Sequence, residues 1–479
     1  MHNRFTQTGR WATAAPDSEP LENRRRVIIL GGGFGGVNCA RTLSRELKPG
    51  EAEVVLFSRE NHLVFSPLLA EAVGASINPL DIVVPLRQLL PRVFCRTEEV
   101  RAIDFARSEI EYETADHERC RMAYDQLVIA CGNTANLQAT PGMAEHGFAL
   151  KNIDDALALR CHILERMERA EVCADPGRRR RHLTFVVVGG GFSGVEVAGD
   201  VNDLVRSSAR YFKNFVAKDI SVRLVHSGSQ LLPEINRDLR EFARKKLEHA
   251  GIQVTLGARV RSALREGVAL EGGQFIEADT IVCTAGSAPA RVLEHLAVAR
   301  EKGRLATRPD MRLRDWSKVW AIGDSALILN QFDQRLSPPT GQFAERQGAQ
   351  CARNIVRVLR DQPTRPFHFK PFGTLCSIGG HSAVAELFGL SMAGFLAWFV
   401  WRGVYLFKLP TWLQRLQVGF DWALLLLFPR DLSHLRHPAK ACRTCCVQGR
   451  ARGGCTCSFF AACKRFQQAT LASAEPALF

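Results

Sequence analysis

Two glycine-rich segments, each preceded by a short apolar run, constrain this chain more than any other feature. The first follows residues 27–30 and has its glycines at Gly31, Gly33 and Gly36. The second follows residues 185–188 and repeats the pattern at Gly189, Gly191 and Gly194. A buried strand that enters a helix through GxGxxG brings backbone N–H groups and the positive end of the helix dipole to a pyrophosphate. The pair therefore indicates two dinucleotide-binding units.

A second internal echo supports this duplication. Strand-like runs at residues 125–132 and 280–286 both end in small-residue turns, which contain Gly132 and Gly286. We expect each turn to approach the dinucleotide of its own unit, and the repeat indicates two homologous domains. The simplest chemistry for two dinucleotides that meet is hydride transfer between a nicotinamide and a flavin.

Composition fixes the class of protein and its surroundings. With 479 residues, 46% of them hydrophobic, the chain is long enough for two or three domains with cores. From Arg430 onward it carries eight Lys or Arg against two acidic residues. No nucleic-acid motif accompanies this basic end, so we predict an anionic membrane surface and no nucleic-acid partner. Fifteen scattered cysteines and the lack of a signal peptide indicate a reducing cytoplasm.

Residues around the first loop predict a nucleotide site. Phe34 lies inside the loop, a helix is expected over residues 37–47, and strands are expected over residues 53–57 and 94–100. The end of the strand at residues 53–57, where an acid would accept the adenosine ribose hydroxyls, is occupied by Ser58. Glu60 takes this role from two residues on, unless it is only a solvated loop carboxylate.

The second loop leads to a candidate catalytic carboxylate. Glu196 lies two residues past Gly194, and we expect it in the first helical turn, facing a nicotinamide. The alternative is a simple charge at a helix N-terminus. The following strand, residues 221–225, ends at His226, where an acid would select NADH, so NADH and NADPH both stay open.

Two later segments predict contacts with a flavin. Residues 319–324 form an apolar strand that ends in Gly323 and Asp324, and a carboxylate there can accept hydrogen bonds from a ribityl chain. Residues 338–340, Pro-Pro-Thr, then begin a helix with Gln342, Glu345 and Gln347 near its start. A helix N-terminus aimed at a flavin carbonyl would stabilise the reduced anionic ring.

Together these motifs resemble the type II NADH:quinone oxidoreductases over residues 26–436. The resemblance rests on both glycine loops, the Gly-Asp strand end and the motif at Gln342, Ala344 and Gln347, where Gly341 replaces the usual Ala. It implies that quinone is bound near Gln342 and Gln347, and that Glu196 and the second loop bind the nicotinamide. It implies FAD at Gly31, Gly33, Gly36, Gly323 and Asp324.

The resemblance also implies an architecture and an activity. The fold is α/β, with two Rossmann-type domains: FAD at residues 25–150 and 300–365, and NAD(P)H at residues 151–299. A membrane-binding region (366–436) follows, and tails at residues 1–24 and 437–479 are expected to be disordered. A hydride passes from NADH to FAD, and two electrons then pass to a membrane quinone, ubiquinone or menaquinone, without proton pumping. The expected location is the cytoplasmic face of the inner membrane, as a peripheral protein and, by analogy, a homodimer.

The C-terminal region predicts an interfacial anchor. Its apolar runs, residues 387–401 and 418–428, are shorter than the roughly 20 residues that span a bilayer. Four tryptophans and several basic side chains lie among the aliphatics, which is typical of monotopic binding: Trp398, Trp401, Trp412, Trp422, Arg402, Lys408 and Arg415. The alternative is a helical hairpin that only caps the core.

Cysteines define the competing functions. The only CxxC, Cys442 to Cys445, lies in the tail, which disfavours dithiol reductases. Cys131, Cys161 and Cys376 would serve a sulfide:quinone oxidoreductase, and a flavoprotein redox sensor without turnover is a further alternative. Six tail cysteines fit no zinc spacing, so we predict no metal site.

Overall fold

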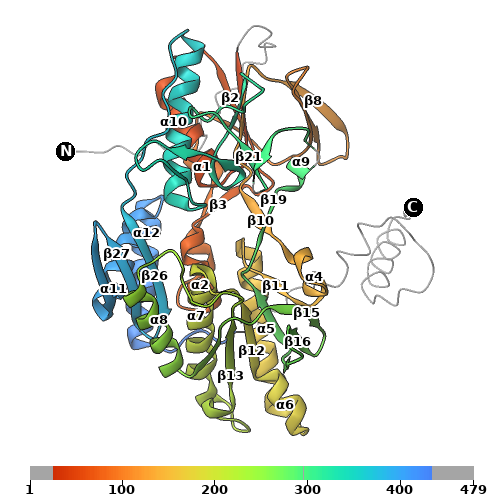
Figure 1. The fold of residues 1–479 in the computed structure, drawn as a ribbon, viewed down its shortest axis with the longest axis vertical. Helices are drawn as coiled ribbons and strands as arrows, with labels where there is room; N and C mark the ends of the chain where they lie inside the picture. Colours follow the sequence, from red (N-terminus) through yellow and green to blue (C-terminus); the bar gives the residue numbers. More distant parts are fainter. Residues whose placement is uncertain (1–24, 295, 302, 434–479) are drawn as a thin grey trace, which may run out of the picture. The chain divides into compact units, whose positions relative to one another are not determined.

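The computed structural model describes residues 25–294, 296–301 and 303–433, so both predicted tails lie outside the described residues. A five-stranded sheet with the order β22-β9-β1-β2-β5 carries the first glycine loop (Figure 1). All its pairings are parallel. Its strands are β1 (Arg26–Leu30), β2 (Glu53–Phe57), β5 (Phe94–Arg96), β9 (Gln126–Ile129) and β22 (Val319–Ala321).

A second parallel sheet, with the order β11-β18-β12-β13-β14, repeats this arrangement around the second loop. Leu30 pairs with Phe57 and Ile129 in the first sheet, while Val188 pairs with Val225 and Cys283 in the second. The predicted duplication of an α/β unit is therefore confirmed. The strands are β11 (Phe148–Ala149), β12 (Thr184–Val188), β13 (Ser221–Val225), β14 (Ile252–Thr255) and β18 (Thr280–Cys283).

Each glycine loop opens a helix, and each helix packs on a different later element. Helix α1 (Phe34–Glu46) packs on α10 (Gly341–Leu359) so closely that a Cβ on Gly348 would lie 2.2 Å from the Gly35 carbonyl oxygen. Helix α7 (Phe192–Ser208) packs on β26 (Gly373–Gly379) instead. The two homologous units therefore present their loop helices to different neighbours.

Smaller elements complete the two units. The chain segments that link the sheets pair with each other as β10 (Asn133–Ala135) and β19 (Ser287–Pro289). Antiparallel meanders follow in each unit: β6 (Glu99–Asp104), β7 (Glu109–Glu113) and β8 (Arg119–Ala123), then β15 (Val260–Leu264), β16 (Gly267–Leu270) and β17 (Phe275–Glu277). The longer helices beside the second sheet are α5 (Ile153–Val172) and α8 (Arg237–His249).

The C-terminal region shares its core with the second unit. It consists of β26, β27 (Ser382–Leu387), β28 (Leu390–Gly394), α11 (Phe395–Lys408) and α12 (Trp412–Leu427). Trp401 and Trp422 belong to the same buried cluster as Leu204 of α7. This region is therefore packed into the core of the second unit.

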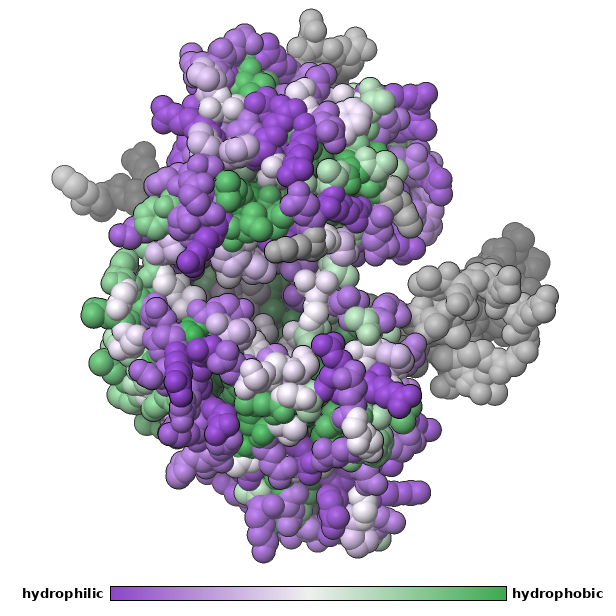
Figure 2. All heavy atoms as spheres, in the orientation of Figure 1, coloured by the Kyte–Doolittle hydropathy of each residue, from purple (hydrophilic) through white to green (hydrophobic). Residues whose placement is uncertain are grey.

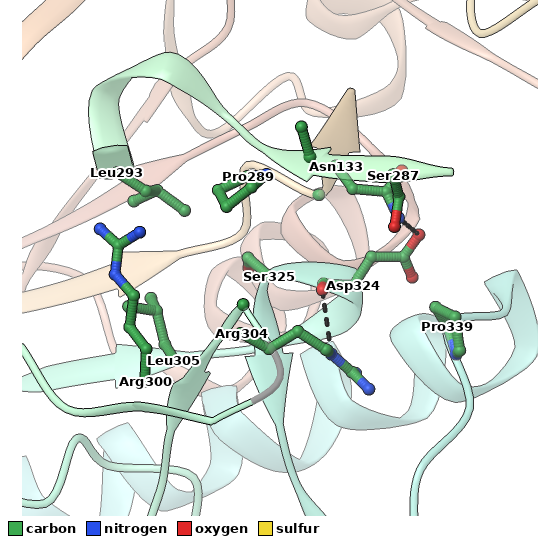
Figure 3. A pocket seen from close by; sticks show the side chains of 13 residues that line it. Asn133, Ser287, Pro289, Leu293, Arg300, Arg304, Leu305, Asp324, Ser325 and Pro339 are labelled. Carbon is green, nitrogen blue, oxygen red and sulfur yellow. Dashed lines mark hydrogen bonds between the residues drawn. The ribbon is translucent and has the colours of Figure 1, made fainter. Parts of the chain in front are cut away.

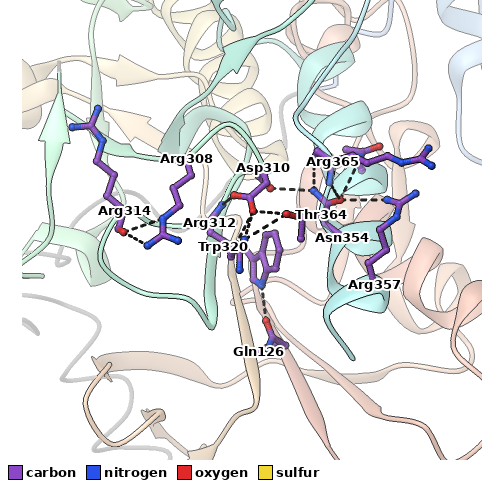
Figure 4. Close-up of polar contacts among 11 residues, drawn as sticks. Gln126, Arg308, Asp310, Arg312, Arg314, Trp320, Asn354, Arg357, Thr364 and Arg365 are labelled. Carbon is purple, nitrogen blue, oxygen red and sulfur yellow. Dashed lines mark hydrogen bonds and ion pairs between the residues drawn. The ribbon is translucent and has the colours of Figure 1, made fainter. Parts of the chain in front are cut away.

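A buried polar network fixes the outer strand of the first sheet (Figure 4). The indole of Trp320 in β22 donates to Gln126 in β9 at 2.7 Å. Asp310 accepts from Arg312 at 2.7 Å and from Thr364 at 2.8 Å, and its carbonyl accepts from Asn354 of α10. Arg312 pairs with Trp320 in an isolated bridge and lies over its ring, so the network connects β22, which leads to Asp324, to α10.

Two local expectations require correction. The strand expected over residues 94–100 is two strands, β5 and β6, because the chain leaves the sheet at residues 97–98, where Arg96 bonds Glu98 at 2.6 Å. The first helix begins at Phe34, inside the glycine loop, earlier than residue 37. The apolar run at residues 387–401 is divided between β28 and α11. Among the described helices, none has the length and apolarity to cross a bilayer.

Candidate dinucleotide and electron-transfer site

The first glycine loop has the geometry of a pyrophosphate cradle. Gly31 takes a φ of +113° and donates its N–H to the Phe57 carbonyl at 2.7 Å. A Cβ on Gly36 would lie 1.9 Å from the Gly31 oxygen, whereas one on Gly33 would meet nothing within 4 Å. The loop is therefore closed towards the sheet and open at the N-terminus of α1, whose first turn has no acidic side chain.

The second loop reproduces these features residue by residue. Gly189 takes a φ of +123° and donates to the Val225 carbonyl at 2.9 Å. A Cβ on Gly194 would lie 1.8 Å from the Gly189 oxygen, and one on Gly191 would again meet open space. Two loops with matching open sides fit two dinucleotides.

Asp324 lies in a pocket between the first sheet and the linking strands (Figure 3). Its carboxylate accepts from the side-chain amide of Asn133 at 3.0 Å, and Lys151 donates to the same side chain of Asn133 at 3.0 Å. Burial raises the pKa of Asp324, while Lys151 and Arg304 oppose that shift. A carboxylate held this way is placed to accept hydrogen bonds from the hydroxyls of a flavin side chain.

Gln347 supports the Gly-Asp turn from beneath. Its side-chain oxygen accepts the Gly323 N–H at 2.8 Å, and the residue is 1% exposed. Gln342, at the start of α10, donates from its side-chain amide to the Gly373 carbonyl at 3.0 Å. The two glutamines thus lie on one helix, but Gln347 is engaged with the turn that carries Asp324.

The turns after β9 and β18 close against the two loops. A Cβ on Gly31 would meet the Ala130 oxygen at 2.3 Å, and one on Gly189 would meet Thr284 Oγ1 at 2.5 Å. Gly132 lines the Asp324 pocket, and Gly286 is the equivalent residue of the second unit, at the same distance past its strand. The structure thus brings both small-residue turns beside the glycine loops, and their approach to a dinucleotide stays a prediction.

The two strand ends after β2 and β13 differ. Ser58 lies against the first loop, since a Cβ on Gly32 would lie 2.6 Å from the Ser58 Oγ. Glu60 is exposed, and its role in binding ribose stays a prediction. His226 accepts the Gly190 N–H on Nδ1 at 3.1 Å, and burial lowers its pKa, so it is neutral at pH 7.

Glu196 lies deeper than the sequence indicates. Because α7 already begins at Phe192, Glu196 lies beyond the first turn, which corrects the expected placement. Its Oε1 accepts the Ser377 N–H at 3.3 Å. Burial raises the pKa of Glu196 to about 8; the Ser377 bond opposes this shift and nearby Glu71 adds to it. The carboxyl is therefore mostly protonated at neutral pH.

Sequence reasoning missed several buried charged residues near this site. Glu71, in α2 (Leu69–Val73), accepts the Trp422 indole N–H at 2.5 Å and lies 3.8 Å from the Arg402 guanidinium. Asp200 of α7 is buried as well, and burial raises its pKa. The sequence does carry a signal for Glu71, because it is the one acid in the apolar run of residues 68–73. Asn133 and Lys151 had no comparable signal.

Aromatic side chains close the space between the two units. Phe34 of α1 meets Phe65 edge-on at 5.8 Å between ring centroids, and Phe65 meets Tyr405 of α11 at 6.1 Å. Gly341, at the start of α10, lies against the Phe34 ring. The N-termini of α1 and α10 and helix α11 therefore converge on one apolar region. Phe192 of the second loop packs against the same buried cluster as Phe34 and Tyr405. Two dinucleotide loops beside such a region define a pyridine nucleotide-linked flavoprotein.

Comparisons with known proteins agree with this class. Residues 25–348 match the family model for pyridine nucleotide-disulphide oxidoreductases, and residues 372–431 match that for the NDH2 C-terminal domain. The type II NADH:quinone oxidoreductase NdhA of Mycobacterium tuberculosis is 31% identical over 84% of this chain and 87% of its own. The demethylphylloquinone reductase NdbB of Synechocystis is 30% identical over 83% and 96%.

A solved structure has the same fold. NDH2 from Plasmodium falciparum in complex with NADH aligns with a TM-score of 0.79 at 19% identity, over 86% of this chain and all of that one. The chain therefore belongs to the type II NADH:quinone oxidoreductases, within the pyridine nucleotide-disulphide oxidoreductase family.

Proposed function

We propose that this protein oxidises NADH and reduces a membrane quinone without pumping protons. Two observations carry the proposal: two matched glycine loops flank one apolar region, and a C-terminal domain of the NDH2 type packs on the second unit. FAD, when bound, supplies a centre that takes a hydride from NADH and gives two electrons to quinone. The residues of this chain bind and orient the reactants.

Residues of the first unit bind FAD. The pyrophosphate is met by the N–H groups at the start of α1, beside Gly33 and Phe34. Asp324 accepts hydrogen bonds from the flavin side chain, and Gln347 holds the turn that presents it. Glu60 completes the ribose contacts. In this proposal residues 25–150 and 300–365 form the FAD domain.

Residues of the second unit bind NADH. The loop of Gly189, Gly191 and Gly194 meets its pyrophosphate, and residues 151–299 form this domain. Glu196 orients the nicotinamide: because its carboxyl is mostly protonated at pH 7, it can donate as well as accept a hydrogen bond. NADPH stays an alternative, since neutral His226 carries no charge against a 2′-phosphate.

The quinone approaches from α10 and α11. Gln342 lies at the N-terminus of α10, where the helix dipole favours developing negative charge. We assign it the quinone contact. For Gln347 the same contact requires its amide nitrogen, because its oxygen is bonded to Gly323. The quinone is a ubiquinone or a menaquinone.

Helices α11 and α12 supply the membrane surface. Of the four tryptophans expected at the interface, only Trp412 is exposed, at 70%, because Trp398, Trp401 and Trp422 pack into the core. Phenylalanine and leucine take their place, and apolar side chains gather over these helices in Figure 2. The exposed large side chains on α11 and α12 are Phe395, Leu396, Phe399, Phe407, Trp412, Leu413, Leu416, Phe420, Leu426 and Leu427.

An apolar face of this size marks a membrane or partner surface. We propose that the protein binds the inner membrane through it, on the cytoplasmic face, as a homodimer. Phe399→Glu with Leu416→Glu should weaken sedimentation with anionic vesicles by at least about tenfold, since each side chain contributes on the order of 2 kcal/mol of burial. Leu264→Glu, at an exposed site on β15, is the matched control. Equal loss in the control would contradict the assignment.

The catalytic proposal is tested by anaerobic stopped-flow bleaching of the flavin. The purified protein is mixed separately with NADH, NADPH and sulfide, and a short-chain quinone is then added. Rapid bleaching by NADH and recovery on quinone are expected. Slow turnover in membranes that contain the protein would favour a redox sensor instead.

Sulfide:quinone activity is the second candidate, and the cysteines disfavour it. Burial raises the pKa of Cys131 to about 12 and that of Cys376 well above its ordinary value, so both are thiols at neutral pH. Cys161 is buried on α5. Bleaching by sulfide alone, lost in Cys376→Ser, would reverse this choice.

A further inference from the structure

A second cleft lies in the NADH unit, away from its glycine loop. It measures about 730 Å³, within the range of small-molecule pockets. Its walls include α5, α6 (Pro176–His182) and the turn between β15 and β16. His182 lies two residues before β12 and Asp279 immediately precedes β18, so the cleft borders the amino ends of these strands. The coenzyme loop follows the carboxyl end of β12, at the opposite edge of the sheet.

The cleft is rich in arginine. Five arginines line it against three acidic residues, Glu145, Glu266 and Asp279. Asp279 is already engaged: its carboxylate lies 2.7 Å from Arg181 Nε and 3.7 Å from Arg166 Nη1, and it also pairs with His182. The arginines are Arg166, Arg169, Arg178, Arg181 and Arg265.

The outer arginines have the capacity to bind an anion. Arg178 and Arg265 are exposed, and within the described part of the chain neither guanidinium forms an ion pair. Arg178 and Arg181 are three residues apart on α6 and therefore share a side of it. The C-terminal dipole of α6 favours cations but does not explain why Arg265, from another element, lines the same cleft. An anion bound between these arginines would relieve their mutual repulsion.

An aromatic wall adjoins these charges. Phe148 and His162 pack with ring centroids 4.6 Å apart. Burial, with a smaller contribution from Arg166, lowers the pKa of His162 to about 4, so its ring is neutral at pH 7. Uncharged rings beside arginines suit a ligand that joins a planar base to phosphates.

We propose that this cleft binds a nucleoside di- or triphosphate, at a site separate from both glycine loops. Arg178 and Arg265 contact the phosphates from opposite walls, while Arg166 and Arg181, held by Asp279, form the floor. The Phe148–His162 pair contacts the base. The location in the NADH unit gives such a ligand a route to influence coenzyme binding through β12 and β18.

The test uses the FAD-loaded full chain with NAD⁺ at saturation, so that the coenzyme loop is filled. ATP, tripolyphosphate and orthophosphate are titrated calorimetrically. We expect one ATP site, with affinity about tenfold weaker in Arg178→Gln and in Arg265→Gln, since each loses a charge-assisted hydrogen bond. Arg261→Gln, on the exposed side of β15 and outside the cleft, should bind ATP like the parent. NADH oxidation should be retained in all three variants.

Several results would overturn the proposal. If NAD⁺ abolishes ATP binding, the nucleotide binds at the coenzyme loop and not in this cleft. If Arg261→Gln weakens binding as much as the cleft variants do, only general surface charge is responsible. Equal affinities for ATP and tripolyphosphate would remove the nucleoside from the assignment, because the aromatic wall would then make no contribution.

Discussion

The two Rossmann-type units of this protein have nearly the same loop and different surroundings. Both loop helices have an N-cap glycine with φ −80° and ψ −172°, and both last glycines would place a Cβ within 2 Å of a carbonyl oxygen. The loops are also nearly identical in sequence, since residues 31–37 and 189–195 differ only at Gly35 and Ser193. Such a loop selects a dinucleotide, but it does not select which one.

We expect the selection to depend on neighbouring residues at equivalent positions. The residue two past the last glycine is Asn38 in the first unit and Glu196 in the second. Asn38 bonds its own helix, at the Phe34 carbonyl, whereas Glu196 reaches Ser377 of the C-terminal region. The second unit therefore has a titratable group at a position where the first has only an amide.

The largest effect is expected from substitutions that disrupt the two glycine loops one at a time. Gly36→Val should strip FAD from the purified protein, and Gly194→Val should leave FAD bound but weaken NADH. In each case the new side chain collides with a backbone oxygen that cannot move without opening the loop. We expect at least about a tenfold loss in each, from an overpacking cost of roughly 1–3 kcal/mol. Flavin absorbance and NADH titration measure the two losses.

Gly403→Ala provides the control, because a Cβ there meets nothing within 4 Å and the glycine lies inside α11. It should keep both dinucleotides. If Gly194→Val lost FAD as readily as Gly36→Val, the assignment of one dinucleotide to each loop would be wrong.

A smaller effect is expected from the pH dependence of Glu196. Its pKa in the folded protein, about 8, lies above the ordinary value of 4.5. The folded state therefore holds a proton that the unfolded state releases, and this contribution to stability is complete below pH 4.5 and is lost as the pH rises towards 8. Glu196→Gln keeps the neutral shape, so its Tm should exceed that of the parent at pH 8 by a few degrees, and by less at pH 5.

Asn38→Asp is the matched change in the first unit. Glu196→Ala adds a functional readout, since the KM for NADH should rise if the carboxyl orients the nicotinamide. A parental KM in that variant would remove the role from Glu196. If the difference in Tm between Glu196→Gln and the parent were the same at pH 5 and pH 8, the carboxyl of Glu196 would be exposed to water and not buried.

The sequence predicts most of the framework and less of the site. The strands at residues 53–57 and 221–225 have the predicted bounds. The first is a continuous apolar run after Glu53, and the second alternates apolar residues with Ser221 and Arg223 before its apolar end. The two loops and Asp324 also follow strands where the sequence places them, since local backbone requirements mark them, while their binding roles stay predictions. The burial of Trp398 was not predictable, because a tryptophan suits a membrane interface and a core equally well.

The sequence does not show which side chains of different helices and strands contact each other. Asn133 donates to Asp324 from a linking strand, and Lys151, before α5, donates to Asn133. Both residues lie more than 170 positions before Asp324. Gln347 resembled a substrate ligand, yet its oxygen holds Gly323. Asn133 and Asp324 meet because the strands that precede them, β9 and β22, pair in the first sheet, and Gln347 joins them from α10.

The smallest effect is expected from substitutions at the residues that follow β2 and β13. Ser58 and His226 occupy equivalent positions, each at the residue after a strand that pairs with the loop strand. His226→Asp should raise the preference for NADH over NADPH by about tenfold, because a carboxylate accepts the free ribose hydroxyl and repels a 2′-phosphate. Ser58→Asp should leave that preference unchanged, since it faces the other dinucleotide. Steady-state kcat/KM for both coenzymes measures the ratio. If His226→Asp lowered both values equally, the imidazole would serve only to hold the Gly190 N–H, and the choice of coenzyme would depend on other residues.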